Sequence, residues 1–197
     1  RARPGILSKD GLTAAEMGTA LHAFLEHADF AALAAAKQAG TLDEAILAER
    51  DRQVHAQLTA PEIADKLDVR RIRRFAESDA FARICAADEV LRELAFITAL
   101  PASAVLAAQG SAAPEGEAAK ASVLVQGIAD IVLIFPDHLE LLDYKTDRRK
   151  TEADFLAAYR AQLNLYALAI DKRFAPKKVT YKGIYSLELG KLIEVKG

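Results

Sequence analysis

The chain has 197 residues and a formal net charge of −2; 52% of its residues are hydrophobic and 27% are charged. This length and apolar content suit one globular domain, or a core with a helical annex, and they exclude an intrinsically disordered chain. Cys85 is the only cysteine, which excludes a disulfide framework and a self-contained iron–sulfur or cysteine-type zinc site.

The sequence also bears on where the protein acts. No apolar run is long enough for a membrane span and the N-terminus lacks a signal-peptide pattern, so we expect a cytoplasmic protein. The chain begins at Arg1 rather than at Met, which predicts that it is part of a longer protein. Residues 141–197 carry 12 Lys and Arg against 7 Asp and Glu, whereas residues 1–140 have an acidic surplus. Such basic clusters are either solvated surface or phosphate contacts.

The first 88 residues are predicted to form a helical part. Capping-box patterns begin two of its helices, at Thr13–Glu16 and at Thr41–Glu44, and Pro61 suits the first turn of another. After an entry loop over residues 1–12, the expected helices run over residues 13–38 and 41–58, from residue 59 onward, and over residues 69–77 and 80–86.

The remaining residues, 89–197, predict an α/β core. Strands are expected over residues 89–98, 123–135, 139–146, 179–187 and 191–195. A loop is expected over residues 109–121, and Thr151 or Asp154 is predicted to begin a helix that ends near residue 172. The order β-β-β-α-β-β predicts a mixed sheet.

The hairpin formed by the second and third strands carries the most informative side chains. Residues 123–135 are almost wholly apolar, so we expect this strand to be buried on both faces, and Asp130 lies inside it. An ionised carboxylate in apolar surroundings is disfavoured unless it is paired or holds a cation. On the next strand Asp143 and Lys145 share one face because side chains alternate. Two acids and a lysine therefore converge, although a surface ion pair is the ordinary explanation of Asp143 and Lys145 alone.

Five motifs along this pattern are similar to those of a known nuclease family. They are GTALH (Gly18–His22), RELAF (Arg92–Phe96), GIAD (Gly127–Asp130), DYKT (Asp143–Thr146) and QLNLY (Gln162–Tyr166). Together they resemble the RecB-type nucleases of the PD-(D/E)xK superfamily, and most of all the nuclease domain at the C-terminus of AddA/RecB helicase–nuclease subunits. The resemblance covers most of the chain. It implies a restriction-endonuclease-like α/β core with a mixed central sheet and an N-terminal helical annex.

The resemblance also implies a metal site. His22, Asp130 and Asp143 match residues that bind a divalent cation, and the backbone carbonyl of Tyr144 matches the group that completes the protein ligands. Lys145 matches the lysine that positions the attacking water and stabilises charge in the transition state. Hard carboxylate oxygens suit Mg²⁺ or Mn²⁺, and a histidine nitrogen tilts the site towards Mn²⁺. Members of the family with four cysteines hold an iron–sulfur cluster, which we do not expect here.

Further residues are expected to support this chemistry. Gln162 and Tyr166 match a pair that supports the lysine and the DNA backbone. The expected DNA-binding rim consists of Arg148, Arg149, Lys150 and Arg160.

Several of these residues also have ordinary structural explanations. His22 is alternatively a helix-surface histidine, and Tyr166 is alternatively a core residue with a satisfied hydroxyl. Glu93 is either an edge-strand charge or a group behind the metal ligands. Thr146 is either a local cap or a functional residue.

We therefore expect a metal-dependent DNA exonuclease or endonuclease domain of a helicase–nuclease complex, acting in double-strand-break end processing and recombinational repair. The expected partners are DNA, helicase domains of the same polypeptide and an AddB-like subunit, with no membrane. The alternative is a catalytically inactive nuclease-fold module for single-stranded DNA binding or subunit docking, against which the intact set of site residues argues. A hydrolase of small phosphoesters is disfavoured by the basic surplus and by the lack of a glycine-rich phosphate cradle.

Overall fold

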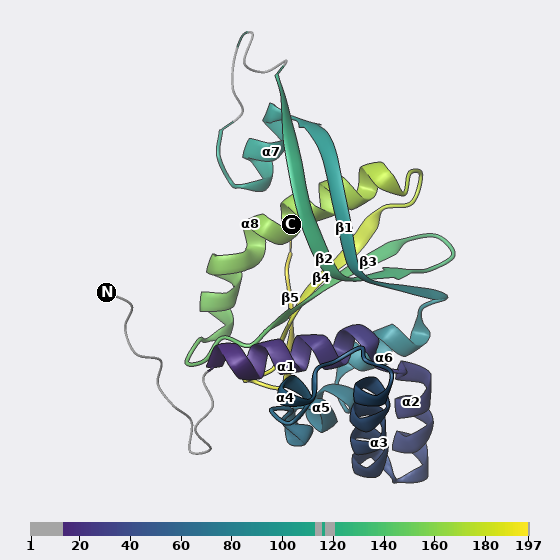
Figure 1. Ribbon diagram of the computed structural model, residues 1–197. Helices are drawn as coiled ribbons and strands as arrows, with labels where there is room; N and C mark the ends of the chain where they lie inside the picture. Colours follow the sequence, from purple (N-terminus) through teal and green to yellow (C-terminus); the bar gives the residue numbers. More distant parts are fainter. Residues whose placement is uncertain (1–13, 113–115, 117–120, 197) are drawn as a thin grey trace. The chain divides into compact units, whose positions relative to one another are not determined.

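The computed structural model describes residues 14–112, 116 and 121–196 (Figure 1). The chain divides into two compact units. The first comprises the helices up to Ala86 together with residues 144–149 and 185–192, and the second comprises residues 87–143, 150–184 and 193–197. Over the described residues, no helix combines the length and the apolar character that crossing a bilayer requires.

The first unit contains six helices among its described residues. They are α1 (Ala14–His27), α2 (Phe30–Ala39), α3 (Leu42–His55), α4 (Pro61–Ala64), α5 (Val69–Ala76) and α6 (Asp79–Ala86). Phe75 of α5 stands at the centre of an aromatic cluster, with its ring centroid 5.4 Å from that of Tyr144 and 5.2 Å from that of Tyr185. This cluster packs the end of the third strand against α5 within the unit.

The single helix predicted up to residue 38 is wrong, because the chain breaks between α1 and α2. Asp29 adopts an extended conformation and caps α2, accepting a hydrogen bond from the Ala32 N–H at 2.9 Å. Two residues of α3 hold the break: Glu49 Oε1 accepts from the Asp29 N–H, and Arg52 donates to the His27 carbonyl. The cap and these long-range bonds outweigh the helix propensity of the alanine-rich sequence around them.

The predicted helix starts have mixed outcomes. At Thr151 the prediction is confirmed: its side chain accepts from the Asp154 N–H, and Asp154 accepts from the Thr151 N–H at 2.8 Å. Thr41 precedes α3 but makes no side-chain capping bond, so that capping box is wrong. Pro61 occupies the first turn of α4, as predicted. Thr13 lies outside the described residues.

One five-stranded sheet contains all the described strands, in the order β1-β2-β3-β4-β5. They are β1 (Glu89–Pro101), β2 (Ser122–Ile134), β3 (Leu139–Lys145), β4 (Val179–Ser186) and β5 (Lys191–Glu194). Neighbours among the first three strands are antiparallel.

Helix α8 (Glu152–Arg173) connects β3 to β4. At the start of both strands the Leu139 N–H donates to the Lys178 carbonyl, and after their ends the Leu187 N–H donates to the Lys145 carbonyl. These bonds align β3 and β4 in the same direction. The sheet is therefore mixed, and the predicted α/β fold class is confirmed.

The core of the second unit lies between the sheet and α8. Its fully buried members come from both, and they include Val132, Leu139, Phe155, Leu163 and Ile184. A helix that sequence analysis did not predict, α7 (Ala102–Ala108), follows β1 and also contacts β1, β2 and α8. These helices cover one face of the β1–β2 hairpin, which Figure 1 shows as a long arm.

The other face of this hairpin corrects a second prediction. We expected residues 123–135 to be buried on both faces. This is confirmed at Ile131, Val132 and Leu133, which are buried, but Leu124 is 66% exposed and Ile128 is 52% exposed. Their neighbours Val125 and Ala129, which point to the opposite face, are buried. The apolar run therefore predicts that these residues form a strand. Whether each side chain is buried depends on which helices cover that face of the strand.

Candidate functional site

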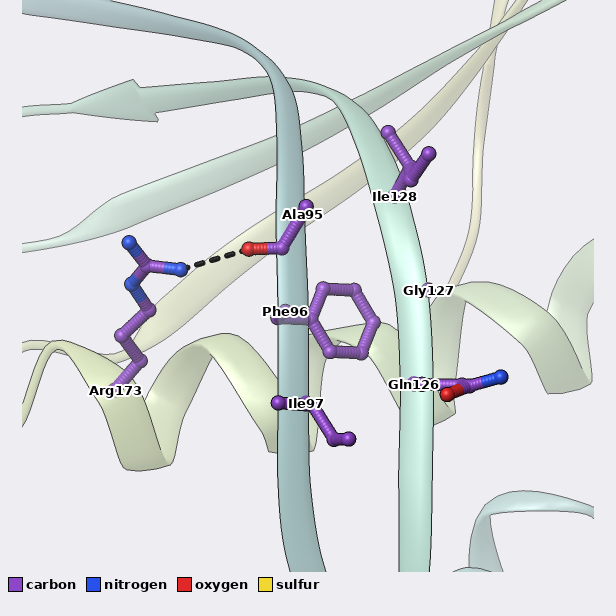
Figure 2. Close-up of a pocket in the computed structure, with 7 residues that line it drawn as sticks. All are labelled: Ala95, Phe96, Ile97, Gln126, Gly127, Ile128 and Arg173. Carbon is purple, nitrogen blue, oxygen red and sulfur yellow. Dashed lines mark hydrogen bonds between the residues drawn. The ribbon is translucent and has the colours of Figure 1, made fainter.

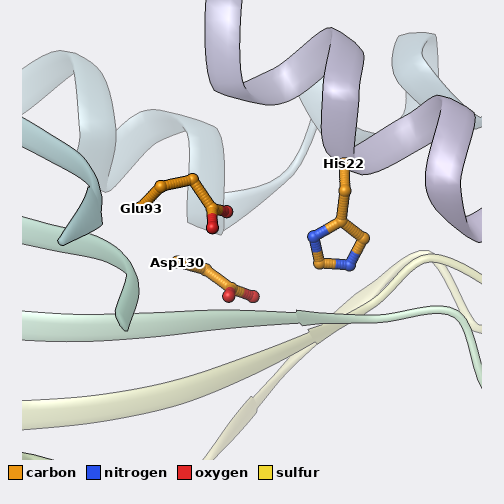
Figure 3. A group of neighbouring side chains, drawn as sticks. All are labelled: His22, Glu93 and Asp130. Carbon is orange, nitrogen blue, oxygen red and sulfur yellow. The ribbon is translucent and has the colours of Figure 1, made fainter. Parts of the chain in front are cut away.

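Glu93 of β1 and Asp130 of β2 form the centre of the site. The strands pair Arg92 with Ile131 and Leu94 with Ala129, so Glu93 and Asp130 lie opposite each other between these two pairs. A ligand oxygen of Glu93 lies within 4.8 Å of one of Asp130, and both side chains are half-buried (Figure 3). Two carboxylates at this separation repel each other in the absence of a cation, and they can share one.

The backbone at Glu93 is strained. Its φ angle is 45°, a left-handed conformation that residues other than glycine seldom adopt. Strain of this kind costs of order 1–3 kcal/mol and is concentrated at functional sites. The sequence alone indicated no direct role for Glu93, because a positive φ angle leaves no signal in the residue types. The only available signal was an acidic residue within an apolar strand, which is the signal that pointed to Asp130.

Asp143 of β3 extends this pair to a row. The β2–β3 register pairs Ile131 with Leu142, so one step further along the same register Asp143 lies opposite Asp130. Asp143 is buried, with 5% of its surface exposed. Because opposite residues of neighbouring strands share a face, Glu93, Asp130 and Asp143 form a carboxylate row across three strands.

The two residues that follow Asp143 on β3 belong to the first unit. Tyr144 is buried, and its ring packs against Phe75 and His22, with the His22 centroid at 6.0 Å. The side chain of Tyr144 thus serves packing, which leaves its backbone carbonyl as the group predicted to bind metal. Lys145, two residues after Asp143, is half-buried.

His22 lies on α1 within the first unit, beside a close approach of two segments. A Cβ atom at Gly18 would lie 2.8 Å from Thr146 Oγ1, so only glycine lets α1 approach the segment after β3 this closely. A groove of about 470 Å³ lies here, lined by His22, Thr19, Glu26 and Thr146 among others. Gly18 therefore allows the close backbone approach that its position in the motif predicts.

Tyr166 of α8 explains why Gly127 is a glycine. A Cβ at Gly127 would lie 2.7 Å from the Tyr166 hydroxyl and 2.8 Å from Phe96 Cζ. The Phe96 and Tyr166 rings meet edge to face, with centroids 4.9 Å apart. Gln162 is half-buried on the same helix, and the chemical roles of both residues stay predictions.

The predicted basic rim is divided between the units. Arg148 and Arg149 belong to the first, and Lys150 and Arg160 to the second. Lys150 contacts the aromatic side of α8: its Nζ lies 4.8 Å from the centroid of the Tyr159 ring and 3.4 Å from the hydroxyl. Arg160 borders a groove between α7 and α8. Whether these four residues bind DNA stays a prediction.

A further cation, Lys182, contacts Asn164, which lines that groove. Lys182 of β4 donates to Asn164 Oδ1 at 2.5 Å, and Asn164 Nδ2 donates to the Ala108 carbonyl at the end of α7. Burial lowers the pKa of Lys182, and the charge of Arg160 lowers it further. This chain of bonds joins β4, α8 and α7 and fixes the helices that cover the β1–β2 hairpin.

Comparisons with known proteins show the family of the chain. A family model described as the PD-(D/E)XK nuclease superfamily matches residues 1–194. The chain is 36% identical over 200 residues to an ATP-dependent helicase/nuclease subunit of Heliobacterium modesticaldum, covering 96% of this chain and 13% of that protein. It is 35% identical to the protein of the same name from Bacillus mycoides and 34% identical to that of Ligilactobacillus salivarius, covering 87% and 77% of this chain. The chain spans only 12–14% of the length of these relatives.

Proposed function

Since the chain belongs to the PD-(D/E)XK nuclease superfamily, we propose that it is the nuclease domain of a longer helicase–nuclease protein and hydrolyses phosphodiester bonds of DNA with a divalent metal ion. The observation that carries the proposal is the carboxylate row of Glu93, Asp130 and Asp143. Such an oxygen-rich set suits Mg²⁺ or Mn²⁺ and leaves positions for water and phosphate.

The residues present fit a metal ion. Glu93 and Asp130 offer oxygens close enough to share one cation, and Asp143 is the next carboxylate in the row. When bound, the ion would activate water and neutralise charge on the phosphate. The strained backbone at Glu93 supports this role, because it keeps a carboxylate opposite Asp130 at a cost in stability.

We further propose that His22 and the Tyr144 carbonyl complete the ligands. The GTALH motif places His22 four residues after Gly18, the spacing of the histidine motif that the sequence resembles. A nitrogen ligand among oxygens favours Mn²⁺ over Mg²⁺. His22 would also pack edge to face on the Tyr144 ring, which would hold its orientation.

Lys145 is the proposed partner of the substrate. Side chains two residues apart on a strand share a face, so the Lys145 ammonium would lie on the side of β3 that carries Asp143. An ammonium group is a compact donor that suits a phosphate oxygen or the attacking water. Gln162 and Tyr166 would support this end of the site from α8, and Arg148, Arg149, Lys150 and Arg160 would contact the DNA backbone.

The names of the relatives support a proposal for the whole protein. Because they are named helicase/nuclease subunits and are far longer than this chain, we propose helicase domains in the same polypeptide and a second, AddB-like subunit. The process would be double-strand-break end processing and recombinational repair, in the cytoplasm.

Cleavage of labelled single-stranded DNA in Mg²⁺ or Mn²⁺ tests the proposal, with Asp143→Ala as the inactive control. We expect metal-dependent cutting by the chain and none by the variant. Equal cutting by both proteins would contradict the assigned site. Absence of both cutting and metal binding would favour a non-catalytic module.

A further inference from the structure

The open face of the β1–β2 hairpin continues outward from the carboxylate row. We call it the strip, and it consists of three cross-strand pairs: Ala95–Ile128, Ile97–Gln126 and Ala99–Leu124. All six residues are exposed, Ile97 to 65% and Leu124 to 66%. The first pair lies two residues from Glu93 on β1 and two from Asp130 on β2. A contiguous exposed apolar surface often marks a site of interaction with another molecule.

Two cations are fixed along the edge of the strip. β1 is the edge strand, and residues at the end of α8 bind its carbonyls. Arg173 donates to the Ala95 carbonyl at 2.9 Å (Figure 2), and Lys172 donates to the Ala99 carbonyl at 2.8 Å. Both side chains are exposed, so their charges face solvent. These bonds occupy the carbonyls that an added strand would need, which disfavours edge-to-edge pairing with another chain.

The strip and its edge enclose a shallow groove of about 730 Å³. Ile97, Ile128 and Arg173 line it together with the amide side chain of Gln126 (Figure 2). No carboxylate is present among the six residues of the strip, all of which the structure describes. The surface thus offers an apolar floor, a neutral hydrogen-bonding amide and a positive edge.

We propose that this strip binds single-stranded DNA beside the scissile bond, with bases against Ile97, Leu124 and Ile128 and phosphates along Lys172 and Arg173. The proposal rests on the proposed nuclease function, since a strand cut at the carboxylate row has to leave it along some surface. Proteins that bind single strands without sequence preference combine a positive track for the backbone with side chains against which the bases lie, commonly aromatic ones. In the strip, aliphatic side chains would take that place. The fixed cations, and the continuity with the row, favour DNA over a protein partner as the occupant.

The charged edge is tested by salt dependence. We would measure binding of a fluorescein-labelled oligothymidylate in Ca²⁺ by anisotropy for Lys172→Gln/Arg173→Gln. Each phosphate contact on a single strand contributes about 0.7 to the slope of log affinity against log salt, so we expect the slope to become shallower by about 1.4. The matched control is Lys177→Gln/Lys178→Gln, where Lys177 likewise donates to a backbone carbonyl, that of Phe135. The control is expected to keep the wild-type slope.

The apolar floor is tested by a second pair of variants. Ile97→Ser/Ile128→Ser is expected to weaken oligonucleotide binding about five- to tenfold, because each isoleucine would lose apolar contact with a base. Leu47→Ser/Leu58→Ser, which changes two exposed leucines of the first unit, is expected to leave the affinity unchanged.

Two results would overturn the inference: an unchanged salt slope in the edge variant, or an unchanged affinity in the floor variant. Hydrolysis of bis(p-nitrophenyl) phosphate by the wild-type chain separates this failure from failure of the proposed function. That substrate is too small to reach from the carboxylate row along the strip. A wild-type chain that hydrolyses it with Mn²⁺, while both double variants bind DNA normally, would leave the nuclease standing and assign the strip to a protein partner.

Discussion

The two halves of the β1–β2 pair share strands and register, yet they present different side chains to their surroundings. The inner half presents Glu93 and Asp130, half-buried and close together on a strained backbone. The outer half presents Ile97, Leu124 and Ile128, exposed on a regular ladder. Strand alternation decides which side chains share a face, but the surroundings decide whether that face becomes a polar site or an apolar surface. The inner half therefore contains a residue with a strained backbone, Glu93, whereas the residues of the outer half that the structure describes have no positive φ angle.

The largest effect that the comparison predicts is chemical and confined to the inner half. Replacing Glu93 with Gln removes one charged ligand while keeping the side-chain volume, and we expect metal-dependent DNA cleavage to fall about 100-fold. Glu89→Gln changes an exposed acid four residues earlier on the same strand and is expected to cut at the wild-type rate. Equal rates for the two variants in a single-turnover assay would remove Glu93 from the site.

The junction of the two halves predicts a structural effect. Gly127→Ala would place a methyl group against Tyr166 and Phe96, and we expect the free energy of unfolding to fall by about 2 kcal/mol. Urea denaturation measures this loss. Because the clash is with one ring pair, the same substitution in a Tyr166→Ala background is expected to cost less. An equal loss of unfolding free energy in the two backgrounds would show that the contact with Tyr166 is not the cause of the destabilisation by Gly127→Ala.

The strain at Glu93 predicts a gain in stability on removing the side chain. Glycine adopts a φ of 45° without steric cost, so Glu93→Gly is expected to raise the free energy of unfolding by about 1 kcal/mol while abolishing activity. Glu89→Gly, on ordinary strand backbone, is expected to lower it by about 0.5–1 kcal/mol. If thermal melts show both variants destabilised alike, the inner half is not strained.

The smallest effect belongs to the outer half. Ile97→Thr keeps β-branching and changes a side chain that is 65% exposed, so we expect a stability change within about 0.5 kcal/mol. Phe96→Leu, one residue earlier on the covered face, is expected to cost more because Phe96 is buried against Tyr166. A large loss for Ile97→Thr in denaturant melts would mean that the strip is covered by part of this chain.

The sequence predicted the order of strands and the pairing of Asp130 with Asp143, because an acid inside an apolar run is conspicuous and a short turn fixes the register. The proposed role of Glu93 as a metal ligand was not predicted, because the position of its carboxylate depends on a backbone angle that the residue types do not reveal. The exposure of Leu124 and Ile128 was not predicted either, because the number of helices covering a face is a tertiary property. The break at Asp29 did leave a signal, an aspartate that can cap a helix, but the alanine-rich periodicity around it concealed the break.

Titration of the chain with Mn²⁺ by isothermal calorimetry tests the central claim that the carboxylate row holds a divalent ion. Asp130→Asn is the informative variant, because Asp130 lies between Glu93 and Asp143. Its control is Asp137→Asn, which changes an exposed residue in the turn between β2 and β3. We predict binding by the wild-type chain and the control, and an affinity at least about tenfold weaker in Asp130→Asn. Equal Mn²⁺ affinity in all three proteins would contradict the account.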